Sequence, residues 1–195
     1  MMANQSQMML LRWQLDVAWS LLELHLADLD DAEILWEPAP TCWTVRPRAD
    51  GRWVADWMAP DAEPEPEPAP SIAWLTWHIG FWWTLTYERS FGVREVRRDE
   101  VFWPGSTDAT VEWLRACKDR WSGALTHLDD ADLQSTARSG WFLRGTRPFG
   151  FVVAWVNSEL MKNAAEIGLL RNLRQASLDG YHMPVRKAPE TPGAA

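Results

Sequence analysis

Residues 70–92, with the sequence PSIAWLTWHIGFWWTLTYERSFG, decide the fold. Large side chains recur in this stretch at every third or fourth position, which is the spacing of one face of a helix. Ser71 stands in a good N-cap position, and Gly92 is a typical helix stop. The stretch therefore predicts a helix from residue 72 to about residue 91. Its inward positions are Trp74, His78, Phe81 and Leu85.

Three more segments show helical spacing. The first covers residues 8–29 and is rich in leucine, and the third covers about 106–128. Cys117 falls in the apolar stripe of the third segment, where a cysteine acts as a small buried apolar side chain. The last segment covers about 148–176, with Pro148 in its first turn. Together with the 72–91 helix, these segments predict an all-α fold, a four-helix bundle.

The bundle is expected to form a single domain over residues 1–180, with a flexible tail at 181–195. The connection at residues 36–70 is far longer than a bundle needs. Its Asp50-Gly51 dipeptide between two β-prone segments predicts a small hairpin.

Three loop segments carry expectations of their own. Residues 43–57 are predicted to form a lid or wall over one end of the bundle, because structured long loops are often functional. Residues 59–70, APDAEPEPEPAP, favour an extended, exposed linker. Residues 140–147 are expected to close the same end as residues 43–57.

Charge and composition exclude several partners. The 195 residues include 27 Asp and Glu against 19 Lys and Arg, a formal net charge of −8. This balance argues against nucleic acid and against an anionic membrane surface. Cys42 and Cys117 make no CxxC motif, and neither a signal peptide nor a membrane-spanning run is evident. We therefore expect a cytoplasmic protein.

The sequence contains 15 Trp residues, many of them clustered. Tryptophan often lines binding clefts, but it also fills cores. The candidates for a pocket wall are Trp74, Trp77, Trp82 and Trp155.

Polar side chains fall within the apolar stripe of the last helix. Glu159, Asn163 and Glu166 share that face, so they are expected to point inward, as His78 does. Buried carboxylates need compensation, because desolvating an unpaired charge costs several kcal/mol. A bound cation, protonation, Lys162 or an arginine could supply it. Alternatively, the carboxylates form ordinary helix ion pairs with Lys162, and His78 is a hydrogen-bonded core residue.

The segments PSIAWLTWHIG and WVNSELMKNAAEIGLLRNL resemble the DinB-like superfamily, and a Trp-rich branch of it in particular. The resemblance covers about residues 8–176. It implies an up-up-down-down bundle and a homodimer. It also implies a divalent metal, commonly zinc or nickel, held by three histidines, one from the second helix and two from the fourth. Members with assigned chemistry are often low-molecular-weight thiol transferases or isomerases.

Carried over to this chain, His78 in the WHIG motif matches the ligand of the second helix. The fourth helix departs from the family, since residues 148–176 contain no histidine. In place of the histidine pair stand Asn157, Glu159, Lys162 and Asn163. One imidazole with carboxylates could still hold Zn, Ni or Mn, with His78 and Glu159 as ligands.

Two functions are therefore predicted. The first is a metal- and thiol-dependent transferase or isomerase that acts in a Trp-lined pocket at one end of the bundle. Its catalytic residues would be His78, Glu159 and Lys162, and Asn163 and Glu166 would bind substrate beside the tryptophans. The alternative is a non-catalytic module for a small ligand that has lost the tri-histidine site. A third interpretation makes the polar residues a structural network and the tryptophans a dimer interface.

Overall fold

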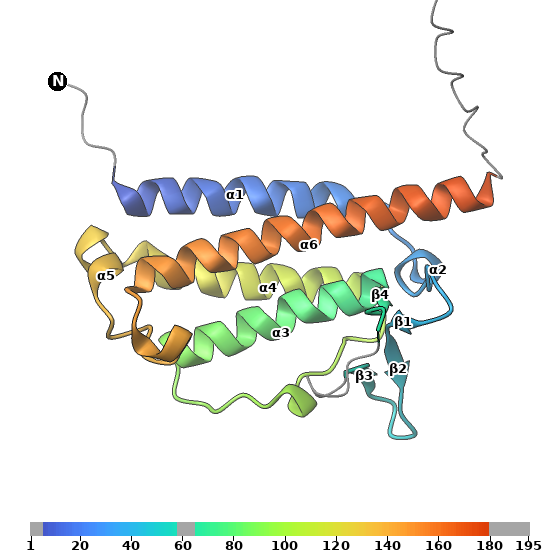
Figure 1. The fold of residues 1–195 in the computed structure, drawn as a ribbon, viewed down its shortest axis with the longest axis horizontal. Coiled ribbons are helices and arrows are strands. Elements are labelled where there is room, and N and C mark those ends of the chain that lie inside the picture. The colour runs from blue at the N-terminus through green and yellow to red at the C-terminus, as the bar shows by residue number, and fades with distance from the viewer. Residues whose placement is uncertain (1–5, 58–64, 180–195) are drawn as a thin grey trace, which may run out of the picture.

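The computed structural model describes residues 6–57 and 65–179. Four long helices lie side by side and confirm the predicted all-α bundle (Figure 1). They are α1 (Gln7–Leu26), α3 (Ile72–Ser90), α4 (Thr107–Thr126) and α6 (Phe149–Leu178). The short elements are α2 (Asp31–Ile34), α5 (Asp130–Gln134), η2 (Arg98–Glu100) and η3 (Phe142–Gly145). The predicted tail at 181–195 lies outside the described residues.

Serine side chains cap three of the long helices. The Ser71 hydroxyl accepts a hydrogen bond from the Trp74 backbone N–H at 3.2 Å, which confirms the N-cap predicted for α3. Ser6 and Ser106 cap α1 and α4 in the same way. Each cap satisfies an N–H group that the first turn leaves without a partner, so these serines fix where the helices begin.

The helices run up, down, down and up, instead of the expected up-up-down-down order. The start of α1 lies beside α5, since Ser6 Oγ donates to Asp130 Oδ1 at 2.6 Å. The start of α4 lies at the opposite end, where the Thr107 N–H donates to Asp31 Oδ1 at 2.8 Å. The physical reason is that α2 and the first connection stay at the end where α1 stops, so α3 must run back. Residues 91–106 then return to that end, and α4 repeats the direction of α3.

An arginine of α6 holds α2 against the end of α1. Arg171 Nη1 donates to the carbonyl oxygens of His25 and Ala27, at 2.9 and 2.8 Å. Its Nε donates to Glu33 Oε1 at 2.9 Å. These bonds satisfy helix-end carbonyls and pair a largely buried carboxylate, which keeps the first connection at this end of the bundle.

The helices pack closely where small side chains allow it. Gly80 of α3 faces Trp113 of α4, and a Cβ atom at position 80 would overlap the indole ring.

In the other half of the bundle, Asn157 Nδ2 of α6 donates to the Leu11 carbonyl of α1 at 2.8 Å. The largest fully buried side chains include Trp77, Trp103, Trp121 and Phe149. The core therefore uses aromatic rings as well as leucines.

The predicted hairpin is present at the end of the bundle where α3 begins (Figure 1). Strand β2 (Val45–Pro47) pairs antiparallel with β3 (Trp53–Ala55), and Gly51 in the turn has a φ of 81°, which favours glycine. Strand β1 (Cys42–Trp43) pairs parallel with β4 (Ala69–Pro70). The linker interpretation of residues 59–70 is wrong for its last three residues, because Pro68 is buried and the next two are paired. Residues 58–64 lie outside the described part of the chain.

The expectation for residues 140–147 is also wrong. Trp141 Nε1 donates to Ser90 Oγ at 3.3 Å, so this segment lies at the C-terminal end of α3. The hairpin lies at the N-terminal end of the same helix. The two segments therefore close opposite ends of the bundle, because α6 starts where α3 stops.

Candidate functional site

A cavity of about 380 Å³ lies where the first half of α3 meets the middle of α6, beside the β1–β4 pair. This volume falls in the range of small-molecule sites. The bundle supplies one wall and the first connection supplies the other. The lining side chains are those of Trp43, Trp57, Glu67, Pro68, Pro70, Trp74, Leu75, His78, Lys162, Asn163 and Glu166.

Three indoles form the aromatic wall. Trp74 stacks on both Trp43 and Trp57, with 6.2 Å between ring centroids in each pair and interplanar angles of 28° and 17°. The Trp74 indole N–H donates to the Asp56 carbonyl oxygen at 2.8 Å. This bond fixes the ring of a helix residue to the hairpin, so the wall is held from both sides.

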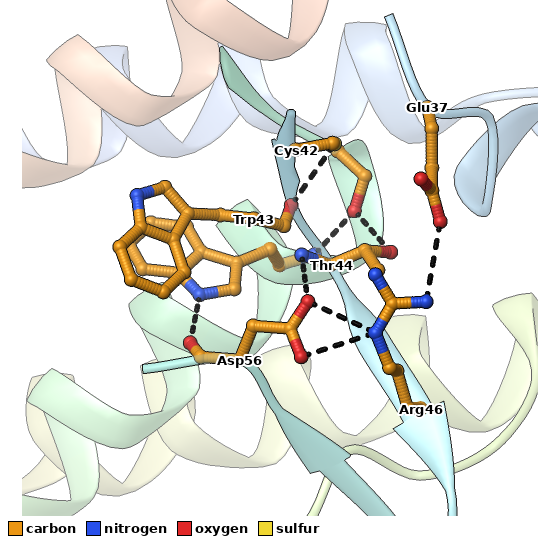
Figure 2. Close-up of polar contacts among 8 residues, drawn as sticks. Glu37, Cys42, Trp43, Thr44, Arg46 and Asp56 are labelled. Carbon is orange, nitrogen blue, oxygen red and sulfur yellow. Dashed lines mark hydrogen bonds and ion pairs between the residues drawn. The ribbon is translucent and has the colours of Figure 1, made fainter. Parts of the chain in front are cut away.

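Charged groups fix the hairpin in its position next to the wall (Figure 2). The Asp56 carboxylate accepts from the Thr44 N–H at 3.2 Å and from Arg46 Nε at 3.2 Å. Arg46 also lies 3.6 Å from Glu37. In addition, the Ser71 hydroxyl at the start of α3 donates to Thr44 Oγ1 at 2.9 Å in a buried contact. The N-cap serine of α3 is thus tied directly to the residue that follows Trp43.

His78 lies in the lining of the cavity together with the indoles and the polar side chains of α6. The residue is 9% exposed. Its imidazole stacks on Trp74, with ring centroids 4.9 Å apart and an interplanar angle of 15°. The Trp82 indole N–H donates to Nε2, and the Asn163 side-chain amide lies 3.5 Å from Nδ1. Burial, together with the Lys162 ammonium, lowers the pKa of His78 from 6.5 to about 4. The ring is therefore neutral at neutral pH.

The hydrogen bond from Trp82 fixes the tautomer of this neutral ring. An indole nitrogen can only donate, so Nε2 must be the acceptor and the single proton must sit on Nδ1. A protonated Nδ1 calls for the oxygen of the Asn163 amide on that side. Asn163 is only 2% exposed, and its Oδ1 as placed has no hydrogen-bond partner among the described residues. Exchanging the two amide atoms would give Nδ1–H its acceptor and direct the NH₂ group away from the imidazole.

Carboxylates surround one ammonium in the polar wall. Lys162 Nζ lies 2.9 Å from Glu159 Oε2 on the preceding turn of α6. Burial raises the pKa of Glu166, and the neighbouring carboxylates of Glu159 and Glu67 raise it further, while Lys162 opposes the shift. The cavity thus presents crowded negative charge beside its indoles.

The structure brings most of the sequence-predicted residues together, but not in one cavity. Trp74, His78, Lys162, Asn163 and Glu166 line the main cavity. Trp82, Trp155 and Glu159 line a second cavity of about 20 Å³, which Asn163 shares. Trp77 lines neither of these cavities. It is 1% exposed, and its indole N–H donates to the Val101 carbonyl at 2.8 Å, so it belongs to the core.

Sequence reasoning did not single out all of the wall. Residues 43–57 were expected to be a lid or wall, and Trp43 and Trp57 do line the cavity. The sequence favours a linker at Glu67 and Pro68, yet both residues line the cavity because β4 pairs with β1. The alternation of prolines in the sequence predicts an extended chain, and an extended chain can pair with the edge of a strand.

The donor set does not fit the metal that the resemblance implies. Among the described residues, His, Cys, Asp and Glu side chains form no group of three that could hold a metal ion. The His78 Nε2 lone pair already accepts from Trp82, and the Glu159 carboxylate already pairs with Lys162. A metal would have to displace both partners and lie next to an ammonium. The polar groups that could ligate a metal are therefore already engaged with one another in this site.

Fold and site together define a four-helix-bundle protein with an aromatic-walled, acidic pocket at one end. The chain belongs to the DinB superfamily, whose family model matches residues 14–167. No curated protein and no solved structure matches it. Among the described helices, none is long and apolar enough to cross a membrane.

Proposed function

We propose that this protein binds a small organic ligand in the 380 Å³ cavity and does so without a tri-histidine metal site. The observation that carries the proposal is the internal bonding of the polar wall. His78 is neutral and engaged by Trp82, and Lys162 is paired with Glu159. Such groups can orient a ligand through hydrogen bonds and charge while the indoles cover its apolar part.

The hairpin supports this proposal, because it fixes Trp74 before any ligand arrives. Its Asp56 carbonyl accepts from the Trp74 indole, and Asp56 itself is bonded to Thr44 and Arg46. A wall held in this way loses little conformational freedom on binding, and preorganisation of this kind raises affinity.

The test is a ligand survey on protein whose tryptophans carry ¹⁵N in the indole. Neutral aromatic, anionic, cationic and thiol compounds are added in turn, and the indole N–H signals are followed by NMR. We expect at least one class to shift the Trp74 signal and to lose affinity in Trp57→Phe. The matched control is Trp13→Phe, at an exposed position of α1. If no class moves Trp74, the proposal fails.

The competing function is the metal- and thiol-dependent transferase or isomerase implied by the resemblance. The observation in its favour is that His78 and Lys162 share one cavity, with Glu159 bonded to Lys162. In that case Lys162 would hold an anionic group of the thiol, and His78 would exchange Trp82 for a metal.

Elemental analysis separates the two functions. Tag-free protein is analysed before and after incubation with Zn²⁺, Ni²⁺ and Mn²⁺, with His78→Ala as the control. The binding-module proposal expects no stoichiometric ion under any condition. About one ion per chain, lost in His78→Ala, would contradict it and support the transferase.

A further inference from the structure

We propose that the cavity takes a small organic cation, a quaternary ammonium compound, held between the indole of Trp43 and the carboxylates of Glu67 and Glu166. This inference rests on the proposed function and names the chemical class of its ligand. Four features of the cavity lead to it: the indole wall, the excess of carboxylate, the unpartnered amide and the size of the space.

The indole wall suits a cation because the faces of aromatic rings carry partial negative charge. One member of the wall already has a cation over it, since the Arg98 guanidinium lies 4.6 Å from the centroid of the Trp57 ring. Trp43 stacks on Trp74, and no other ring or cation among the described residues lies against it. Trp43 thus has a ring face that is not committed to another aromatic or charged group.

The charges of the cavity also favour a cation. The cavity is lined by two carboxylates, those of Glu67 and Glu166, and by the ammonium of Lys162, whose charge is paired with Glu159 outside the lining. Lys162 is paired with Glu159, whereas Glu67 and Glu166 make no ion pair within residues 6–57 and 65–179. Burial is the main cause of the raised pKa of Glu166, and the carboxylates of Glu159 and Glu67 add to the shift. A bound monovalent cation would relieve the repulsion between the two unpaired carboxylates.

Asn163 provides an independent sign of a ligand. It is 2% exposed, lies in the cavity wall, and has one amide atom without a partner among the described residues. A hydroxyl group on the ligand could bond to that atom in either orientation of the amide, since a hydroxyl both donates and accepts.

The shape of the site favours a methylated cation over a bare metal ion. The cavity has room for a molecule, and its indoles offer apolar contact that a hydrated metal ion cannot use. Methyl groups on nitrogen bury apolar area against the indoles while the positive charge remains, which is how aromatic cages recognise quaternary ammonium groups.

The experiment compares choline with 3,3-dimethyl-1-butanol by isothermal titration calorimetry on the full chain. The two compounds have the same shape and the same hydroxyl, but only choline is charged. We expect choline to bind at least about tenfold more tightly. The indole N–H signals of Trp43 and Trp57 should shift with choline in the ¹⁵N spectrum.

Two variants locate the binding site. Glu166→Gln should weaken choline binding at least about fivefold, because it removes one carboxylate at constant size. Glu112→Gln, an exposed glutamate of α4, should leave the affinity unchanged. Trp43→Leu should abolish binding, and Trp43→Phe should retain part of it. If Trp43→Leu fails to fold, the Glu166 and Glu112 pair still decides the question.

Equal binding of choline and its neutral isostere would overturn the inference. So would choline binding that Glu166→Gln leaves intact. If neutral, anionic or thiol compounds shift Trp74 in the ligand survey while choline does not, the ligand class is wrong and the proposed function stands. If no compound shifts Trp74, both fail.

Discussion

Three neighbouring side chains, two indoles and one amide, contact the His78 imidazole, so a metal ion or ligand would have to displace one of them to bind a ring nitrogen. Trp74 covers its face, Trp82 donates to one nitrogen, and Asn163 faces the other. These contacts favour the neutral ring, because a charged imidazole would lose hydration on burial and would lie near the Lys162 ammonium. In this chain the imidazole is therefore a neutral hydrogen-bonding group whose orientation is fixed by these three neighbours.

Acid should destabilise the protein through His78 before most carboxylates protonate. The folded-state pKa of about 4 is below the ordinary histidine value of 6.5, so the unfolded chain binds the proton more readily. The stability that neutral His78 contributes is complete above about pH 6.5 and is lost as the pH falls toward 4. Between pH 7 and 4.5, the free energy of unfolding should fall by about 2 kcal/mol through this residue.

Urea unfolding at the two pH values measures this loss. In His78→Gln the decrease should be smaller than in the wild type by about that amount. His127→Gln, at an exposed position after α4, serves as the control and should unfold with the wild-type pH dependence. An unchanged pH dependence in His78→Gln would contradict the buried, neutral state of the ring.

The position of tryptophans on α3 shows what helix periodicity can and cannot predict. Trp74 and Trp77 lie on the same inward side, and both were predicted as pocket walls. Trp74 donates to the Asp56 carbonyl next to the hairpin and lines the cavity. Trp77 donates instead to the carbonyl of Val101, in the connection between α3 and α4. The period of a helix gives the buried face, but the neighbour that covers each part of that face comes from chain segments distant in sequence.

Two glycines give a matched test of helix packing. Gly80→Ala should lower the free energy of unfolding by about 1–3 kcal/mol, because the new methyl group would displace the Trp113 ring. Gly123→Ala, on α4, meets no other atom within 4 Å and should raise it by up to about 1 kcal/mol through helix propensity. Urea unfolding of both variants measures the difference. Equal effects would mean that α3 and α4 are not in close contact at Gly80.

At the scale of the whole molecule, the sequence was sufficient for the four helices, because each carries its own periodicity and three carry a serine cap. It was also sufficient for the hairpin, where Gly51 marks the turn. The helix directions and the parallel pairing of Cys42 with Ala69 could not be predicted, because they depend on contacts between distant segments. The position of Glu67 in the site follows from that pairing and was missed for the same reason.

The homodimer implied by the family resemblance stays a prediction. Met9, Trp13 and Val17 lie four residues apart on α1 and are each at least 40% exposed, so they form one apolar stripe. Sedimentation equilibrium should give twice the chain mass of 22.4 kDa for the wild type and a single chain mass for Trp13→Glu. A monomeric wild type at high micromolar concentration would contradict the dimer.

The cavity draws its two walls from separate parts of the molecule. The helices provide His78, Lys162 and Asn163, while the β1–β4 pair and the hairpin provide Trp43, Trp57 and Glu67. The second group lies in one continuous insertion, residues 42–70, whose ends are brought together by strand pairing. Exchange of this insertion alone would therefore change the selectivity for the ligand. A chimera that carries another insertion on the same four helices would acquire a new ligand without repacking of the helices.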